Sequence, residues 1–232
     1  MKISNKKIGI ITGSGPEAGL DLWQKILDYN KVLLKDEFKG DLNAPNVTIL
    51  SVAKLGHSME LEKNYYMVWE TLKKCVEDIS SHVDYFVIAC NTLNLYANKI
   101  EEIGYKDKFI STLDVIDEYI QKESLNQIAI IGALPVIQMG EFSVFKPLNE
   151  KFDVEVPLNF DKVQKLIYDV KRVGGNDLSV ISNFKEILEE LNSSNVFLAC
   201  TELPLIKLEY KKKNLVDVTD LLAKKLVDIS YL

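Results

Sequence analysis

Two near-copies of one short sequence constrain the fold of this chain more than any other feature. Residues 85–92 read YFVIACNT, and residues 195–202 read NVFLACTE. Each copy is an apolar run typical of a buried strand, followed by a cysteine and small polar residues where a helix is expected to begin. The copies lie nearly half of the 232-residue chain apart. This spacing predicts two similar halves, each presenting one cysteine.

The position of these two cysteines, Cys90 and Cys200, indicates chemistry rather than packing. In open α/β sheets, ligands bind outside the carboxyl ends of the strands. Two thiols that face one pocket form an acid and a base for moving a proton across a substrate. The third cysteine, Cys75, lies on the apolar stripe of a helix predicted over 60–81 and is expected to be a core residue.

Strand-like and helix-like segments alternate along the whole chain, which predicts parallel sheets covered by helices on both faces. We therefore expect an α/β fold of two pseudo-symmetric, Rossmann-like, three-layer α/β/α domains. The first comprises residues 1–113 plus 211–232 and carries Cys90, and the second comprises 114–210 and carries Cys200. Strands are expected at 8–12, 47–52, 109–113, 128–131, 154–157 and 215–218 and before both cysteines. Helices are expected at 17–35, 60–81, 95–103, 142–149, 162–173 and 177–192 and at the C-terminus.

Charge and composition narrow the range of partners. The formal net charge of −6 argues against nucleic acid, because phosphate neutralisation needs a basic surface. No run approaches the roughly 18 apolar residues of a membrane span, and the apolar stretch after the basic start is too short for a signal peptide. Free thiols without a secretory start are typical of the reducing cytoplasm. We expect a cytoplasmic protein with a small-molecule substrate.

A glycine-rich loop, TGSGPEAG at residues 12–19, joins the first strand to the first helix. Pro16 suits the first helical position, where a missing N–H costs little. A dinucleotide fingerprint fits poorly, because Gly19 lies one place too far and Glu17 would repel a pyrophosphate. Two alternatives remain. The loop is a plain turn, or its N–H groups and the positive helix end hold a small anion such as a carboxylate.

Three segments, in this order and spacing, resemble the aspartate/glutamate racemase family of cofactor-independent amino-acid racemases. They are IGIITGSGPEA at 8–18, ACNT at 89–92 and CTELPL at 200–205, and the resemblance covers nearly the whole chain. The resemblance implies two pseudo-symmetric halves with the site in the interdomain cleft, and a homodimer. It implies an isomerase that racemises an amino acid, aspartate or glutamate first.

The resemblance also implies roles for individual residues. Cys90 and Cys200 would be the catalytic acid and base. The residues expected to bind substrate are Ser14, Asn91, Thr92, Thr201, Arg172 and His57, and those expected to support the site are Gly13, Gly15 and Glu202. Arg172 is the single arginine among 28 basic residues and stands where relatives usually carry a lysine. It is expected either to grip a carboxylate bidentately or to be a surface cation.

The sequence departs from the family pattern in ways that leave the substrate open. Aspartate-specific members carry an arginine after the second strand for the side-chain carboxylate, whereas Ser58 stands there in KLGHS at 54–58. Asn94 replaces the usual histidine after the first cysteine motif. His57 is expected either to supply part of the missing charge or to be an exposed loop residue.

Racemisation removes a proton from one face of Cα and delivers one to the other, which suits two thiols on opposite walls. Helix N-termini or polar neighbours are expected to lower the thiol pKa. No cofactor and no metal are expected, because paired thiols supply both bases and C-x-x-C spacing is absent. The alternatives are a related cysteine-dependent isomerase or decarboxylase and a non-catalytic amino-acid-binding protein.

Overall fold

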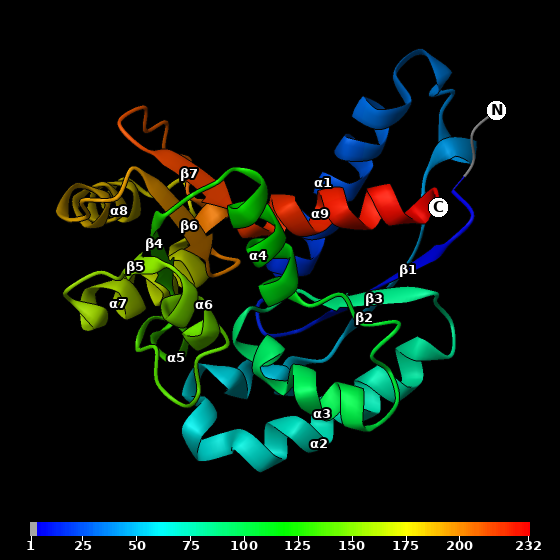
Figure 1. Ribbon diagram of the computed structural model, residues 1–232, viewed down its shortest axis with the longest axis horizontal. Coiled ribbons are helices and arrows are strands. Elements are labelled where there is room, and N and C mark those ends of the chain that lie inside the picture. Colours follow the sequence, from blue (N-terminus) through cyan, green and yellow to red (C-terminus); the bar gives the residue numbers. More distant parts are fainter. Residues whose placement is uncertain (1–3) are drawn as a thin grey trace.

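Two parallel β-sheets organise the computed structural model, which describes residues 4–232 (Figure 1). The strand order is β2–β1–β3 in the first sheet and β5–β4–β6–β7 in the second. The strands are β1 (Lys7–Thr12), β2 (Asn46–Ser51), β3 (Tyr85–Ile88), β4 (Gln127–Gly132), β5 (Asp153–Glu155), β6 (Asn195–Ala199) and β7 (Asn214–Asp217). The α-helices are α1 (Pro16–Leu34), α2 (Leu61–Ser80), α3 (Ala97–Glu102), α4 (Thr112–Lys122), α5 (Leu134–Ile137), α6 (Lys146–Lys151), α7 (Phe160–Val173), α8 (Leu178–Glu190) and α9 (Val218–Ser230). The predicted α/β class with parallel sheets is confirmed.

The two sheets repeat one local strand order. β1 lies between β2 and β3, and β4 lies between β5 and β6, with every pair parallel. Cys90 follows β3 and Cys200 follows β6, so the two thiols leave equivalent strands at their carboxyl ends. The two similar halves predicted from the duplicated segment are therefore present.

Side chains of the first sheet alternate between its two faces, as in a buried parallel sheet. Ile10 belongs to a buried cluster with Leu22 of α1 and Leu226 of α9. Its neighbour Ile11 belongs to another cluster, with Leu72 of α2. Figure 1 shows the sheet between α1 and α9 on one side and α2 and α3 on the other. These two apolar layers hold the strand ends that lead to the first thiol.

The chain passes to the second sheet through α4 and returns through β7 and α9. β7 pairs with β6 in the second sheet, whereas α9 packs beside α1 over the first (Figure 1). The segment 211–232, assigned to the first domain from sequence, thus contains a strand of the second sheet and a helix of the first half. Residues 1–3 of that predicted domain lie outside the described part of the chain.

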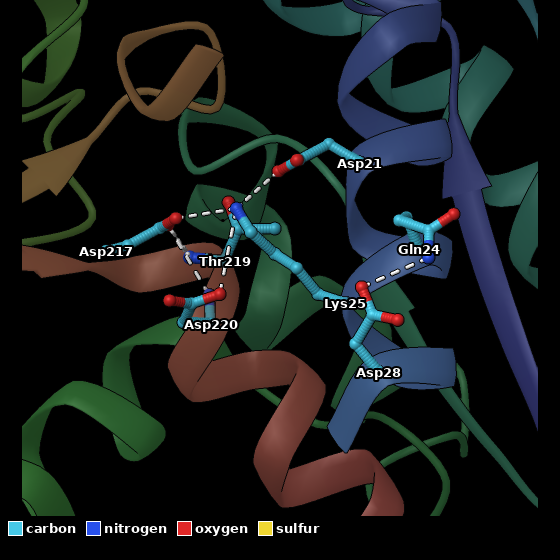
Figure 2. A network of polar contacts seen from close by, with 7 residues as sticks. All are labelled: Asp21, Gln24, Lys25, Asp28, Asp217, Thr219 and Asp220. Carbon is cyan, nitrogen blue, oxygen red and sulfur yellow. Dashed lines mark hydrogen bonds and ion pairs between the residues drawn. The ribbon is translucent and has the colours of Figure 1, made fainter. Parts of the chain in front are cut away.

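A cluster of charges fastens this return crossing to α1 (Figure 2). Lys25 of α1 pairs with Asp21 one turn earlier and, at 2.6 Å, with Asp217 at the end of β7. Asp217 also caps α9, because its Oδ1 accepts a hydrogen bond of 2.8 Å from the backbone N–H of Thr219. One lysine and one aspartate therefore link α1, β7 and the start of α9.

The strand predicted at 109–113 is wrong. Phe109 forms only an isolated bridge with Phe86 of β3, and α4 already begins at Thr112. The side chain of Asn94 stabilises this early helix start: its Oδ1 accepts from the backbone N–H of Thr112 at 2.9 Å, and its Nδ2 donates to the carbonyl of Cys90 at 3.0 Å. Asn94 thus ties the first thiol segment to the crossing helix.

Two other predicted helices differ in extent. The segment predicted as a helix at 95–103 starts as a 3₁₀ turn over Thr92–Tyr96 before α3. The segment predicted at 142–149 becomes helical only from Lys146. Before that point, Ser143 donates to the carbonyl of Val136 and accepts from the N–H of Phe145, which holds the preceding residues in a turn.

The longer amphipathic helices bury their apolar sides in the cores. Cys75 on α2 is 4% exposed and packs in the core of the first half, which confirms its prediction as a core residue. Burial, and then the neighbouring Asp78, raise the pKa of its thiol. Across residues 4–232, no helix combines the length and apolar character needed to cross a bilayer.

Candidate active site

Cys90 and Cys200 line one small cavity where the carboxyl ends of the two sets of strands meet. The cavity measures about 10 Å³, room for about one water molecule. Its walls come from both halves: Ser14, Met59, Cys90, Asn91, Thr92, Ala133, Lys171, Ala199, Cys200, Thr201 and Glu202. The sequence-predicted residues Ser14, Asn91, Thr92, Thr201 and Glu202 are thus brought together with both thiols.

A hydroxyl group lies beside the first thiol. Cys90 is 8% exposed, and its Sγ lies 3.9 Å from the Oγ of Ser58. Ser58 belongs to a 3₁₀ segment, Ala53–Glu60, that follows β2, and its hydroxyl shares a 2.6 Å hydrogen bond with Ser14 in the glycine loop. The position expected to hold an arginine in aspartate-specific relatives therefore carries a buried hydroxyl next to a thiol.

A carboxylate accompanies the second thiol. The Cys200 thiol donates a 2.9 Å hydrogen bond to Oε2 of Glu202, and Oε1 of the same carboxylate lies 2.7 Å from Nζ of Lys171. Burial, and then the charge of Glu202, raise the pKa of the Cys200 thiol well above its ordinary value. The expectation that its surroundings lower the thiol pKa is wrong for Cys200, which is held as a neutral thiol.

The cation of the cavity is Lys171, not Arg172. Lys171 lies four residues after Ile167 and lines the cavity, whereas Arg172 projects into solvent and pairs with Asp169 at 3.1 Å. Successive helical residues point about 100° apart, so only one of the two can face the cavity. Of these two residues, Lys171 lines the cavity and Arg172 does not.

Lys171 keeps its charge in spite of its burial. Desolvation disfavours the ammonium, but the charge of Glu202 and its hydrogen bond to Lys171 outweigh this effect, and the pKa of Lys171 is raised. The sequence analysis favoured Arg172 over Lys171 because arginine is the rarer residue type in this chain. The signal that could have identified it was the helical spacing from the apolar residues Val163 and Ile167.

Polar groups beside the thiols point to a ligand with hydrogen-bonding atoms. Asn91 and Thr92 follow Cys90, and Thr201 follows Cys200; all three are buried. The amide Nδ2 of Asn91 makes no hydrogen bond although it is buried. A buried donor without an acceptor is costly, so this amide is a group that a carboxylate in the cavity would satisfy.

The glycine loop needs its glycines to pack closely against both halves. Gly13 and Gly15 have φ of 125° and 98°, a region that side chains rarely adopt. A Cβ at Gly13 would lie 2.2 Å from the carbonyl oxygen of Val52, and one at Gly15 would lie 2.3 Å from Oε1 of Glu202. Gly15 therefore lets the loop of the first half lie directly against the carboxylate that holds the second thiol.

His57 does not take part in this arrangement. Its side chain is exposed, and it is absent from the residues that line the cavity within the described part of the chain. The prediction that His57 contacts substrate is therefore not supported by its position. Met59, two residues further on, lines the cavity instead and was missed because a lone methionine after a strand carries no motif.

No family model and no curated protein matches the sequence. Solved structures do resemble the fold. An aspartate racemase homologue from Pyrococcus horikoshii OT3 is 20% identical, with a TM-score of 0.73 and 99% of each chain covered. The aspartate racemase of Picrophilus torridus is 19% identical, with a TM-score of 0.77 over 97% of this chain and 94% of that one. A glutamate racemase from Francisella tularensis, in complex with D-glutamate, is 18% identical, with a TM-score of 0.66 over 98% and 81%. The chain therefore has the α/β fold of these aspartate and glutamate racemases.

Proposed function

We propose that this protein is an amino-acid racemase that needs no pyridoxal phosphate and uses Cys90 and Cys200 as its acid and base. One observation carries the proposal. Two thiols from equivalent strand ends in the two halves line a single small cavity. A proton-transfer site of this kind needs two groups on different walls, because the proton leaves one face of Cα and arrives on the other.

The reaction needs one thiolate and one thiol at the start of each turnover. The thiolate takes the proton from Cα, which leaves the electron pair on the substrate, and the opposite thiol gives its proton to that carbon. Because burial and Glu202 raise the pKa of Cys200, we assign this thiol as the proton donor in the resting protein and the opposite residue, Cys90, to the role of the base. In the reverse direction the two residues exchange roles.

The carbanion requires strong stabilisation, since the α-proton of an amino acid is very weakly acidic. Lys171 is a charged donor for the α-carboxylate, where the negative charge develops, and the unpaired amide of Asn91 is a neutral donor for the same group. Thr92 and Thr201 line the same cavity, one from each half. Glu202 is an acceptor for the α-ammonium group. Fixed donors in a cavity that excludes water act far more strongly than they would in solution.

Substrate entry requires that the cavity open, because about 10 Å³ holds only about one water molecule. The two halves are joined through α4 and through the β7–α9 return. Movement about these two crossings would separate the walls that carry the thiols. Closure after binding would then expel water from the reacting carbon.

Solvent deuterium incorporation at Cα tests the proposal. The purified protein, dialysed against a chelator and free of a pyridoxal absorption band, should exchange the α-proton of an L-amino acid and form its D-enantiomer. The panel includes aspartate and glutamate, the acids expected from the family resemblance, together with their amides and small neutral amino acids. Loss of CO₂ or another isomerisation would favour the related decarboxylase or isomerase, and binding without exchange would favour the non-catalytic alternative.

A further inference from the structure

We infer that the substrate of this site is an amino acid with an uncharged side chain, which replaces the acidic substrate expected from the family resemblance. The inference rests on the proposed function. Lys171 is the single cationic side chain that lines the cavity in the part of the chain described, residues 4–232. It is already paired with Glu202 at 2.7 Å.

A zwitterion matches this ion pair one charge for one charge. The α-carboxylate of the substrate can take the place of Glu202 at Lys171, and the α-ammonium group can take the place of Lys171 at Glu202. The unpaired Asn91 amide adds a neutral donor for the carboxylate. The α-groups of any amino acid therefore use the whole charge complement of the cavity, and no cation remains for a second carboxylate.

The reacting thiolate makes a second carboxylate still less favourable. During catalysis one of Cys90 and Cys200 carries a negative charge, in the cavity that the carboxylate of Glu202 also lines. A side-chain carboxylate would bring a further negative charge into a small site lined mostly by buried residues. Like charges in such a site disfavour each other, and a buried charge without a partner is strongly destabilising.

The remaining walls are neutral and mostly apolar. Met59, Ala133 and Ala199 contribute carbon and sulfur surface, and the hydroxyls of Ser14 and Ser58 satisfy each other. Arg172, with a side chain 73% exposed, is paired at the surface with Asp169. These walls suit an aliphatic, hydroxyl or amide side chain.

Isosteric acid–amide pairs provide the direct test. The rates of α-deuterium incorporation, as kcat/KM, are compared for L-asparagine against L-aspartate and for L-glutamine against L-glutamate. One missing charge-assisted contact corresponds to about ten- to hundredfold in specificity. We expect each amide to exceed its acid by at least about tenfold. An acid that equals or exceeds its amide would overturn the inference and leave the proposed function intact, whereas absence of exchange with every amino acid would overturn both.

Met59 allows the missing cation to be added. It is half-buried, lines the cavity and resembles lysine in length. Met59→Lys should lower the amide-to-acid ratio at least about tenfold, and the matched variant Met59→Leu should leave the ratio near that of the wild type. Folding of both is checked by circular dichroism, and the wild-type ratio decides the question if the lysine variant does not fold. An unchanged ratio in a folded Met59→Lys protein would contradict the inference.

Discussion

Cys90 and Cys200 end equivalent strands but have different neighbours. Cys90 lies beside the Ser58 hydroxyl, whereas Cys200 donates to the carboxylate of Glu202, which in turn holds Lys171. The backbone arrangement is therefore repeated in the two halves while the polar surroundings of the thiols are not. This contrast indicates that a duplicated strand order positions both thiols, and that burial and Glu202, which Cys90 lacks as a neighbour, raise the pKa of Cys200.

The largest effect should come from removing either thiol. Cys90→Ser and Cys200→Ser should each lower the racemisation rate by about 10³-fold or more, because a poorly acidic hydroxyl replaces an essential acid–base group. Cys75→Ser is the matched control, since Cys75 lies in the core away from the cavity, and it should keep most of the activity. Substantial racemisation by Cys200→Ser would remove the second half from the mechanism.

Removing the negative charge of Glu202 should reduce the difference between the surroundings of the two thiols. Glu202→Gln keeps an acceptor for the Cys200 thiol but removes the negative charge that raises its pKa. The pKa of Cys200 should therefore fall. In the reaction direction in which Cys200 acts as the base, the pH of half-maximal rate should be lower than in the wild type by about one unit or more. Initial rates in both directions between about pH 6 and pH 10 measure this shift.

Ser58→Ala is the corresponding change beside Cys90. It removes a hydroxyl 3.9 Å from that thiol and leaves Glu202 in place. We expect a severalfold loss of rate with the Cys200-dependent pH profile unchanged. An equal shift of that profile in Ser58→Ala and Glu202→Gln would show that Glu202 has no specific effect on Cys200.

The contact between the halves at Gly15 should have an intermediate effect. Gly15→Ala places a Cβ 2.3 Å from Oε1 of Glu202, in addition to the strain of a φ of 98°. Gly40→Ala carries similar strain at a φ of 101°, but its Cβ would meet nothing within 4 Å. Both variants should lose about 1–3 kcal/mol of unfolding free energy. Only Gly15→Ala should also lower kcat/KM by about tenfold or more, and equal activity losses would show that strain alone is responsible.

The smallest effect on activity is expected from the charge cluster outside the cavity. Lys25→Met leaves Asp21, Asp217 and Asp220 without their shared cation (Figure 2). Because these groups are partly exposed, the free energy of unfolding should fall by only about 1–2 kcal/mol. kcat/KM should stay close to the wild-type value. A large activity loss would mean that the return crossing at β7–α9 affects the thiols directly.

The sequence predicted the halves, the parallel sheets and the two thiols because these depend on local patterns. The apolar run before each cysteine, such as Phe86 to Ile88, is readable without knowing what packs against it. The strand at 109–113 was mispredicted for the opposite reason. Its apolar pattern is real, but Asn94, from a separate segment, stabilises a helix start at Thr112.

The charges of the site were harder to predict because they depend on side-chain direction and on distant neighbours. Lys171 and Arg172 are adjacent in sequence, and only the rotation of α7 decides which one enters the cavity. The raised pKa of Cys200 depends on its burial and on the orientation of Glu202, which also pairs with Lys171 from another helix. The helical spacing from Val163 and Ile167 is a local signal for Lys171, whereas the second relation leaves no local motif.

The central claim is that the two thiols act on opposite faces of one substrate, and single-thiol variants test it most directly. β-Chloroalanine can lose its α-proton to one base and expel chloride, so that Cα–H and Cβ–Cl break as a Cα=Cβ bond forms, without needing the second thiol. Chloride release by Cys90→Ser and by Cys200→Ser is measured with each enantiomer. The account predicts that each variant acts on one enantiomer only, and that the two variants select opposite enantiomers. The same preference in both variants, or none in either, would contradict it.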